Sequence, residues 1–271
     1  MIIRNYCRII TQNCSGWSWK KNKTGFAVRL RSMLKNIAAA DPTVIALQES
    51  YASQAVLAII REIFPENEYR VLLPLAYNPA NKRSVVTIMI VKMQGVLNCT
   101  PLTLYPLTQS CRYNFAELVF ADSTVMRILN IWVPQNSFNS NAPEWYREER
   151  RKLKEMFFSA IKTEAEKYIN SDILFTCFGD FNSSRKEDFL ASLADPSSPT
   201  SFMYEPIAPK DIDTPTWISD SDNSGRDLDH ILFSSGYKKP IAFVQTKIED
   251  SPLKDGLSDH SFLVGTVCFV A

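Results

Sequence analysis

Two strand-like segments follow each other in the middle of the chain with no helix between them. Residues 112–122 (RYNFAELVFAD) and 125–135 (VMRILNIWVPQ) are rich in apolar, β-branched and aromatic residues, and a turn around Ala121 and Asp122 separates them. This pattern predicts an antiparallel hairpin. A purely parallel, doubly wound sheet needs a crossover helix between successive strands, so the segment disfavours that fold.

Further runs of strand and helix character lie on both sides of this hairpin. Strand-like apolar runs occupy residues 6–13, 43–50, 84–92, 172–178, 227–234 and 261–270. Apolar residues at helical spacing predict helices over residues 29–42, 54–66, 143–169 and 187–194, while residues 195–216 form a proline-rich, irregular connection. Strands dominate, so we expect two β-sheets packed face to face with helices outside them.

The composition limits the class of protein. The chain has 271 residues, of which 45% are hydrophobic, so it can bury a large core in one or two domains. It carries 30 basic and 29 acidic residues, a net charge of +1, so any basic surface for nucleic acid must be local. The charges of residues 143–169 are mixed in sign, which is typical of a solvated helix face.

The N-terminal segment does not have the pattern expected of an export signal. Residues 1–13 (MIIRNYCRIITQN) carry charge and amides inside an apolar stretch, which favours a first strand over a signal peptide. No apolar run approaches the roughly 20 residues of a membrane span. The six cysteines show no CxxC pairing, which favours free thiols in a reducing compartment. We therefore expect an intracellular protein without a membrane span.

Five strand ends carry polar groups suited to a metal–phosphate site. Any one of them is compatible with an ordinary turn or a helix cap. Glu49 is the exception, because a Gln-Glu pair that closes an apolar strand is costly unless it has partners. In chain order, the residues are Asn13, Glu49, Asp180 with Asn182, Asp229, and Asp259 with His260.

The order of these motifs resembles that of the endonuclease/exonuclease/phosphatase superfamily, nearest the exonuclease III-like apurinic endonucleases and the endonuclease domains of LINE-type retrotransposons. The resemblance spans residues 13–260. It implies one domain over residues 1–271 with a DNase I-like α/β fold: a four-layer sandwich of two mostly antiparallel β-sheets flanked by helices. It also implies hydrolysis of a phosphate ester with Mg²⁺ or Mn²⁺.

The resemblance implies a metal site of few protein ligands. Glu49 is the candidate for the main ligand, and Asn13 would ligate the ion or orient Glu49. Asp259 would complete the site or serve a second ion. Mg²⁺ prefers oxygen ligands and keeps several waters, so one or two carboxylates suffice.

The remaining motifs imply the catalytic groups. Asp180 resembles the water-activating carboxylate of the family, and Asn182 would position it or contact the phosphate. His260 would donate a hydrogen bond to a phosphate oxygen, with Asp229 as the partner of its imidazole. His230 directly follows Asp229, so its side chain points to the opposite face of the strand, and we interpret it as structural.

One motif departs from the family pattern. In the nuclease branch, the strand before the long helix often ends in Tyr-x-Pro-x-Asn or has a histidine near the proline. Here Trp132 stands in that place, and Asn136 comes one residue late. The only polar donor of tryptophan is its indole N–H, so Gln135 or Asn136 is the candidate phosphate contact. A site with two catalytic histidines is therefore not expected.

Two segments are candidates for substrate binding. Residues 15–25 interleave Trp17 and Trp19 with lysines such as Lys21, a pattern suited to stacking on bases and binding phosphates. The alternative is a folded-back loop whose tryptophans cover the core. Trp217 and Arg226 precede Asp229 within elements that resemble the Thr-x-Trp and Arg-x-Leu-Asp motifs of nuclease members, although a core tryptophan fits Trp217 equally well.

Three functions are compatible with these motifs. The first is a metal-dependent endonuclease acting on nucleic acid, with DNA preferred over RNA. The second is a phosphodiesterase or phosphatase acting on a nucleotide, lipid or other small ester, which the near-neutral charge keeps open. The third is an inactive binding module, which is the least favoured because every core polar position is filled. We expect a monomer.

Overall fold

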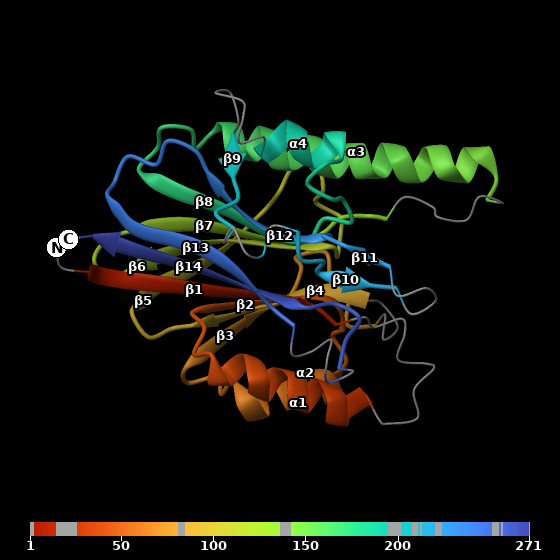
Figure 1. The fold of residues 1–271 in the computed structure, drawn as a ribbon. Coiled ribbons are helices and arrows are strands. Elements are labelled where there is room, and N and C mark those ends of the chain that lie inside the picture. Colours follow the sequence, from red (N-terminus) through yellow and green to blue (C-terminus); the bar gives the residue numbers. More distant parts are fainter. Residues whose placement is uncertain are drawn as a thin grey trace.

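The computed structural model describes residues 3–14, 26–80, 85–135, 142–194, 202–207, 211, 213–219, 224–250, 255 and 257–270. Within them, two six-stranded sheets pack face to face, and helices cover the outer side of each (Figure 1). None of the helices in these ranges combines the length and apolar composition that crossing a membrane requires.

The first sheet has the strand order β13-β14-β1-β2-β4-β3. The pair β1 and β2 is parallel, and the other neighbours are antiparallel. The strands span β1 (Ile3–Asn13), β2 (Val44–Tyr51), β3 (Tyr69–Leu72), β4 (Val85–Lys92), β13 (Ile241–Glu249) and β14 (Phe262–Val270). Helices α1 (Phe26–Ala39) and α2 (Gln54–Ile63) lie against its outer face (Figure 1).

The second sheet has the strand order β5-β6-β7-β8-β12-β9, with β7 and β8 as its parallel pair. Its strands span β5 (Val96–Leu102), β6 (Tyr113–Phe120), β7 (Val125–Trp132), β8 (Ile173–Asp180), β9 (Met203–Tyr204) and β12 (Asp229–Ser234). Helices α3 (Glu144–Glu166) and α4 (Asp188–Ala194) cover it (Figure 1). A short hairpin of β10 (Trp217–Ile218) and β11 (Gly225–Arg226) forms a separate two-stranded sheet.

Three hydrophobic clusters fill the spaces between the layers. One cluster, with Phe178 and Phe233, lies between the two sheets. A second packs the long helix α3 on the second sheet through Phe157 and Phe158, and the third packs α1 and α2 on the first sheet. Three apolar interfaces make four layers, as predicted. Burying each large apolar side chain contributes about 1.5–3 kcal/mol.

The parallel pairs place the polar strand ends at one edge of the sandwich. Asn13 is in register with Gln48 where β1 and β2 end, and Trp132 is in register with Asp180 where β7 and β8 end. The strands β1 and β2 face β7 and β8 across the core. The carboxyl ends of all four strands therefore meet at one edge, where loops carry the functional groups.

The hairpin predicted over residues 112–135 is confirmed, since β6 and β7 pair antiparallel from Tyr113↔Ile131 to Val119↔Val125. The strands β3, β5 and β13 and the two-residue strands β9, β10 and β11 were not predicted from the sequence. The strand β5 contains Pro101, and proline is tolerated in it because β5 is an edge strand. The polar alternation of β13 is likewise that of an edge strand rather than a buried one.

The prediction of a solvated face for residues 143–169 is wrong at two charged positions. Most charged residues of α3 are at least partly exposed, but Lys154 is only 1% exposed and Glu164 only 5%. The helix lies flat on the second sheet, so some of its charged residues face inward together with Phe157 and Phe158. The buried side chain of Lys154 reaches the turn that follows β8.

Gly179 is required where β8 meets β7. Its φ of +135° belongs to a region that other residues rarely adopt, and an added Cβ would lie 2.0 Å from the carbonyl oxygen of Ile131. We expect Gly179→Ala to lower the free energy of unfolding by about 3 kcal/mol or more, measured by chemical denaturation. Gly95→Ala is the control for φ alone, because nothing lies within 4 Å of its added Cβ. Equal losses in the two variants would contradict the steric account.

Candidate active site

Asn13 joins the two sheets at the candidate site. It ends β1 and is fully buried. Its Nδ2 donates to Oε1 of Glu49 at 3.2 Å and to Oδ2 of Asp180 at 2.9 Å. One amide therefore bridges an acid from each sheet, and the two carboxylates are held close together.

A bulge in β2 orients Glu49. The register between β2 and β4 shifts between Leu47 and Ser50, and Glu49 has a φ of 49°, which is uncommon for a residue other than glycine. Burial raises the pKa of Glu49, although His260 and the hydrogen bond from Asn13 act in the opposite direction. A cation placed beside Glu49 would favour its charged form.

The carboxylate of Asp180 accepts hydrogen bonds at both oxygens. The backbone N–H of Asn182 donates to Oδ1 at 2.8 Å, and Nδ2 of Asn182 donates to Oδ2 at 3.0 Å. The same Nδ2 also donates to the carbonyl oxygen of Val133 at 2.9 Å, and Asn182 has a φ of 47°. Burial raises the pKa of Asp180 to about 7, and the nearby Asp229 adds to the increase. A carboxylate with such a pKa is suited to accept a proton near neutral pH.

His260 and Asp229 form a buried pair. Nδ1 of His260 donates to Oδ2 of Asp229 at 2.7 Å. This bond fixes the imidazole, so Nε2 is the nitrogen that would meet a substrate oxygen. Burial lowers the pKa of His260, but the charges of Asp229 and Asp180 outweigh it and raise that pKa to about 10. His260 is therefore a charged donor at neutral pH.

Asp259 links the His260 loop to the β10–β11 hairpin. Nε1 of Trp217 donates to Oδ2 of Asp259 at 3.2 Å, and the N–H of Ile218 donates to the carbonyl oxygen of Asp259 at 3.0 Å. Arg226 lies opposite Trp217 in the hairpin and is exposed. The hairpin is thus held beside His260, with which Trp217 also forms a β-bridge.

Comparisons with known proteins agree with this architecture. No family model matches the chain, and no curated protein matches its sequence. Solved structures do match. An endonuclease/exonuclease/phosphatase from Bacteroides vulgatus superposes with a TM-score of 0.69 at 14% identity, covering 98% of this chain and 100% of that chain. AP endonuclease LMAP from Leishmania major gives 0.65 at 15% identity, covering 100% of this chain and 92% of that chain.

The chain has the endonuclease/exonuclease/phosphatase fold. TDP2 from D. rerio, solved in complex with a single-strand DNA product, shares it with a TM-score of 0.64 at 15% identity, covering 97% of this chain and 99% of that chain. The predicted DNase I-like sandwich of two sheets flanked by helices is confirmed.

The donor set at the edge of this fold suits a Mg²⁺ or Mn²⁺ ion that keeps most of its waters. No group of three or more histidines, cysteines or acids with metal-binding geometry occurs in the part of the chain that the structure describes. Glu49 and Asn13, joined by a hydrogen bond, offer a smaller oxygen set, and Mg²⁺ binds through one or two carboxylates. The carboxylate of Asp259 raises the pKa of Glu49 and is thus within electrostatic range of it.

Several predicted substrate contacts cannot be placed. Trp17, Trp19, Lys21 and Asn136 lie outside the described residues.

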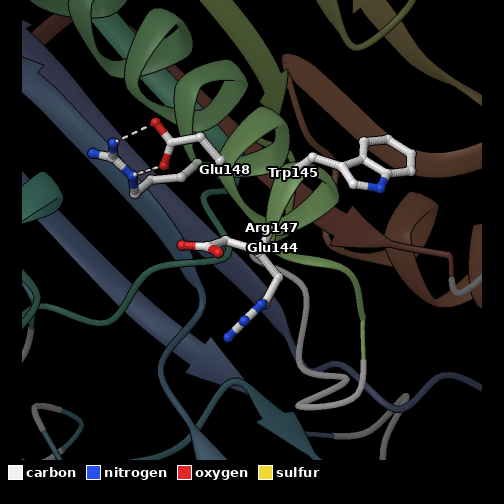
Figure 2. A pocket seen from close by; sticks show the side chains of 5 residues that line it. Glu144, Trp145, Arg147 and Glu148 are labelled. Carbon is white, nitrogen blue, oxygen red and sulfur yellow. Dashed lines mark hydrogen bonds and ion pairs between the residues drawn. The ribbon is translucent and has the colours of Figure 1, made fainter.

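A hollow of about 550 Å³ at the first turns of α3 is lined by Glu144, Trp145, Arg147, Glu148 and Arg151. Figure 2 shows the indole of Trp145 pointing away from the Glu148–Arg151 ion pair. None of the predicted site residues lines this hollow, so we do not assign it to the site.

Arg112 is a site residue that the sequence analysis missed. Its guanidinium lies 3.6 Å from the ring centroid of Trp132. Burial and the charge of Arg150 lower the pKa of Arg112 to about 10, while the charges of Glu49 and Asp180 oppose that change. Arg112 is thus within electrostatic range of both acids. The buried Trp132 therefore serves as a stacking platform for a cation. An arginine just before a strand gave no sequence signal for this role.

We expect Arg112→Ala to lower kcat/KM for phosphodiester hydrolysis by about 100-fold, because it removes a cation that would face the phosphate. Arg112→Lys should recover only part of the loss, since lysine keeps the charge but not the stacked, forked geometry. Arg151→Ala is the matched control, as Arg151 is half-exposed and paired with Glu148 and Glu155. Similar kcat/KM values for Arg112→Ala and Arg151→Ala would show that Arg112 has no role at the site.

His230 lies in a buried ion cluster rather than beside His260. Its Nδ1 faces both carboxylate oxygens of Glu205 at 3.2 and 3.3 Å, and its Nε2 donates to the carbonyl oxygen of Ser183 at 2.8 Å. Arg185 pairs with Glu205 at 2.7 Å and with Asp227 at 3.0 Å. Burial lowers the pKa of His230, but Glu205 outweighs it, and the net shift is upward.

Because of this ion cluster, we expect the free energy of unfolding to fall in acid. Burial alone would raise the pKa of Glu205, but His230 and Arg185 more than offset it and lower that pKa to about 2. A lowered acid pKa gives stability that is complete above the unfolded value of 4.5 and is lost as pH falls toward 2. We expect on the order of 3 kcal/mol of the unfolding free energy to disappear over this range. Denaturation at several pH values should show a smaller dependence in Glu205→Gln, and an unchanged dependence would contradict this assignment.

Proposed function

We propose that the protein is a metal-dependent phosphodiester hydrolase, and that its substrate is nucleic acid, with DNA preferred over RNA. One observation carries the proposal. The amide of Asn13 bridges Glu49 and Asp180 at the edge of the sandwich where the charged His260–Asp229 pair also lies. A carboxylate base, a charged donor and an oxygen set for a divalent ion are the groups that phosphodiester hydrolysis requires.

In the proposed reaction, water attacks the phosphorus atom and the bond to the leaving oxygen breaks. Asp180 accepts the proton of the attacking water. The backbone N–H and the side-chain amide of Asn182 hold the carboxylate of Asp180 in place. Nε2 of His260 donates to a non-bridging phosphate oxygen, and Arg112 adds positive charge on the same edge. The leaving alkoxide takes up a proton from solvent. Mg²⁺ or Mn²⁺ at Glu49 and Asn13 would supply neutralisation of phosphate charge.

The preference for nucleic acid rests on the surroundings of the site. The β10–β11 hairpin holds Trp217 and the exposed Arg226 beside His260, an aromatic and a cation suited to bases and phosphates. Trp17, Trp19, Lys21 and Asn136 stay predicted contacts. Structures that share the fold include an AP endonuclease and a complex with a single-strand DNA product, which favours this substrate class.

A small phosphate ester is the second candidate, because the net charge of +1 gives no general attraction for a polyanion. A panel with Mg²⁺ separates the two candidates: supercoiled plasmid, abasic duplex, single-stranded RNA, sphingomyelin and inositol phosphates. We expect cleavage of DNA that is abolished by chelation and strongly reduced in the Asp180→Asn and His260→Ala variants. Cleavage of only lipid or inositol phosphates would overturn the nucleic-acid proposal. No cleavage of any substrate, together with no Mn²⁺ binding, would overturn the proposal that the protein is an enzyme.

A further inference from the structure

The turn that follows β8 is held by two buried nitrogen donors from elsewhere in the chain. Residues 181–185 form this turn, which we call the Asn182 turn. Nζ of Lys154 donates to the carbonyl oxygen of Asn182 at 2.6 Å, and Nε2 of His230 donates to the carbonyl oxygen of Ser183 at 2.8 Å. Lys154 is 1% exposed and His230 is 0% exposed. Two successive carbonyls are therefore fixed by side chains from α3 and β12.

A buried lysine at position 154 would be unfavourable if its only role were to stabilise the fold. Burial lowers its pKa, and the carboxylate of Glu187 lies 3.5 Å away, farther than the carbonyl oxygen of Asn182. Replacing a buried ion pair as a whole by well-packed apolar side chains is often neutral or stabilising, so stability alone does not require a charged group here. Its shortest bond is instead made to the backbone of the residue that holds Asp180.

His230 is a doubly protonated donor by geometry as well as by charge. Both groups that face its ring nitrogens, the carbonyl oxygen of Ser183 and the carboxylate of Glu205, can only accept hydrogen bonds. Arg185 belongs to the Asn182 turn itself, and its backbone N–H donates to Asp227 at 3.2 Å. The ion cluster around His230 thus anchors the far end of the turn.

The Asn182 turn needs this support because Asn182 has a left-handed backbone and yet must keep two donors on Asp180. A residue in that region costs about 1–3 kcal/mol and persists only when its surroundings hold it. The N–H that donates to Oδ1 of Asp180 belongs to the peptide unit just before Asn182. Rotation of the next two units, which carry the carbonyls of Asn182 and Ser183, would shift the backbone and the side-chain amide of Asn182 relative to Asp180. The carbonyl bonds from Lys154 and His230 oppose that rotation.

We propose that Lys154 and His230 are positioning residues that act through the Asn182 turn on Asp180, which rests on the function proposed above for this site. Neither touches the reacting atoms. Removing either donor loosens the turn, so the carboxylate of Asp180 loses its fixed orientation in the transition state. Because substrate contacts lie elsewhere, kcat falls by roughly 10- to 100-fold while KM is little changed.

The test uses paired substitutions in the full chain. Lys154→Met and His230→Leu remove the donors, whereas Lys154→Arg and His230→Gln keep one. Lys152→Met is the matched control on α3, because Lys152 is 68% exposed and pairs only loosely with Glu148 at 3.5 Å. Steady-state kinetics on the DNA substrate give kcat and KM, and hydrogen–deuterium exchange reports the amides of residues 181–185.

We expect faster exchange in the Asn182 turn and a lower kcat in Lys154→Met and His230→Leu, with unchanged exchange in β7 and β12. Lys154→Arg and His230→Gln should recover most of the protection from exchange and most of kcat. Lys152→Met should match the wild type in both measurements. Unchanged exchange and kcat in Lys154→Met and His230→Leu, or a loss in His230→Gln equal to that in His230→Leu, would overturn the inference.

Two further outcomes are separated by the exchange measurement. If the wild-type protein hydrolyses none of the substrates, the proposed function fails, but exchange in the Asn182 turn still decides whether Lys154 and His230 hold it. If an apolar variant does not fold, Lys154→Gln and His230→Asn replace it, since each side chain is polar but too short to reach the carbonyl oxygen that the native donor holds. Wild-type exchange in both of these would then overturn the inference.

Discussion

Replacing Asp180 with asparagine is expected to reduce kcat for phosphodiester hydrolysis by ~10²–10⁴-fold, because an amide cannot accept the proton of the attacking water. Stability should change in the opposite direction. Burial and Asp229 raise the pKa of Asp180 to about 7, above its unfolded value of 3.8. The charged carboxylate therefore destabilises the folded protein once pH exceeds 3.8, and fully so above 7. Asp180→Asn removes that charge and should raise the melting temperature at alkaline pH.

Rate assays and thermal melts on the same preparations check this pair of effects. Asp188→Asn serves as the control, since Asp188 is an exposed acid in the first turn of α4. A melting temperature that falls in Asp180→Asn would show that the lost rate reflects damaged folding. A rate near that of the wild type would exclude Asp180 as the base.

His260→Ala should combine a comparable loss of rate, ~10²–10³-fold, with a loss of stability. The acids around His260 raise its pKa to about 10 against a desolvation effect that lowers it. A raised histidine pKa gives stability that is complete below the unfolded value of 6.5 and is lost as pH rises through 10. The variant should therefore be less stable than the wild type at neutral pH and converge on it in strong alkali.

A double-mutant cycle tests whether His260 and Asp229 act as one unit. Asp229→Asn should lower the rate less than His260→Ala, and the double variant should be no slower than His260→Ala alone, because the carboxylate works through the imidazole. The measurement is kcat/KM for the four proteins on one DNA substrate. Additive losses would mean that Asp229 has a separate role.

The hairpin over residues 112–135 and the polar strand ends were accessible from the sequence because each depends on local pattern. A hairpin with no helix after its first strand disfavours a purely parallel fold, and an acid or amide at an apolar strand end is visible without coordinates. The four-layer fold followed from these patterns together with the family resemblance.

The partners of these residues were not accessible, since they depend on register and on packing between distant elements. The amide of Asn13 reaches Asp180 only because β1 and β8 face each other across the core. Lys154 looks like its neighbours Arg151 and Lys152 in a helix of mixed charge, and only the orientation of α3 on the sheet buries it. Arg112 stacks on Trp132 because β6 and β7 bring them side by side.

The start of β1 and the end of β14 lie side by side. Ile3 of β1 pairs with Val270 of β14, and Figure 1 shows both ends at the same side of the sheets. From residue 3 to residue 13, β1 extends roughly 33 Å at about 3.3 Å per residue, so Asn13 lies at the opposite end of the strand. A molecule immobilised on the side where Ile3 and Val270 pair would hold the edge with the proposed site toward solution. A long polymer could then approach it, and single-molecule cleavage could be followed on a surface.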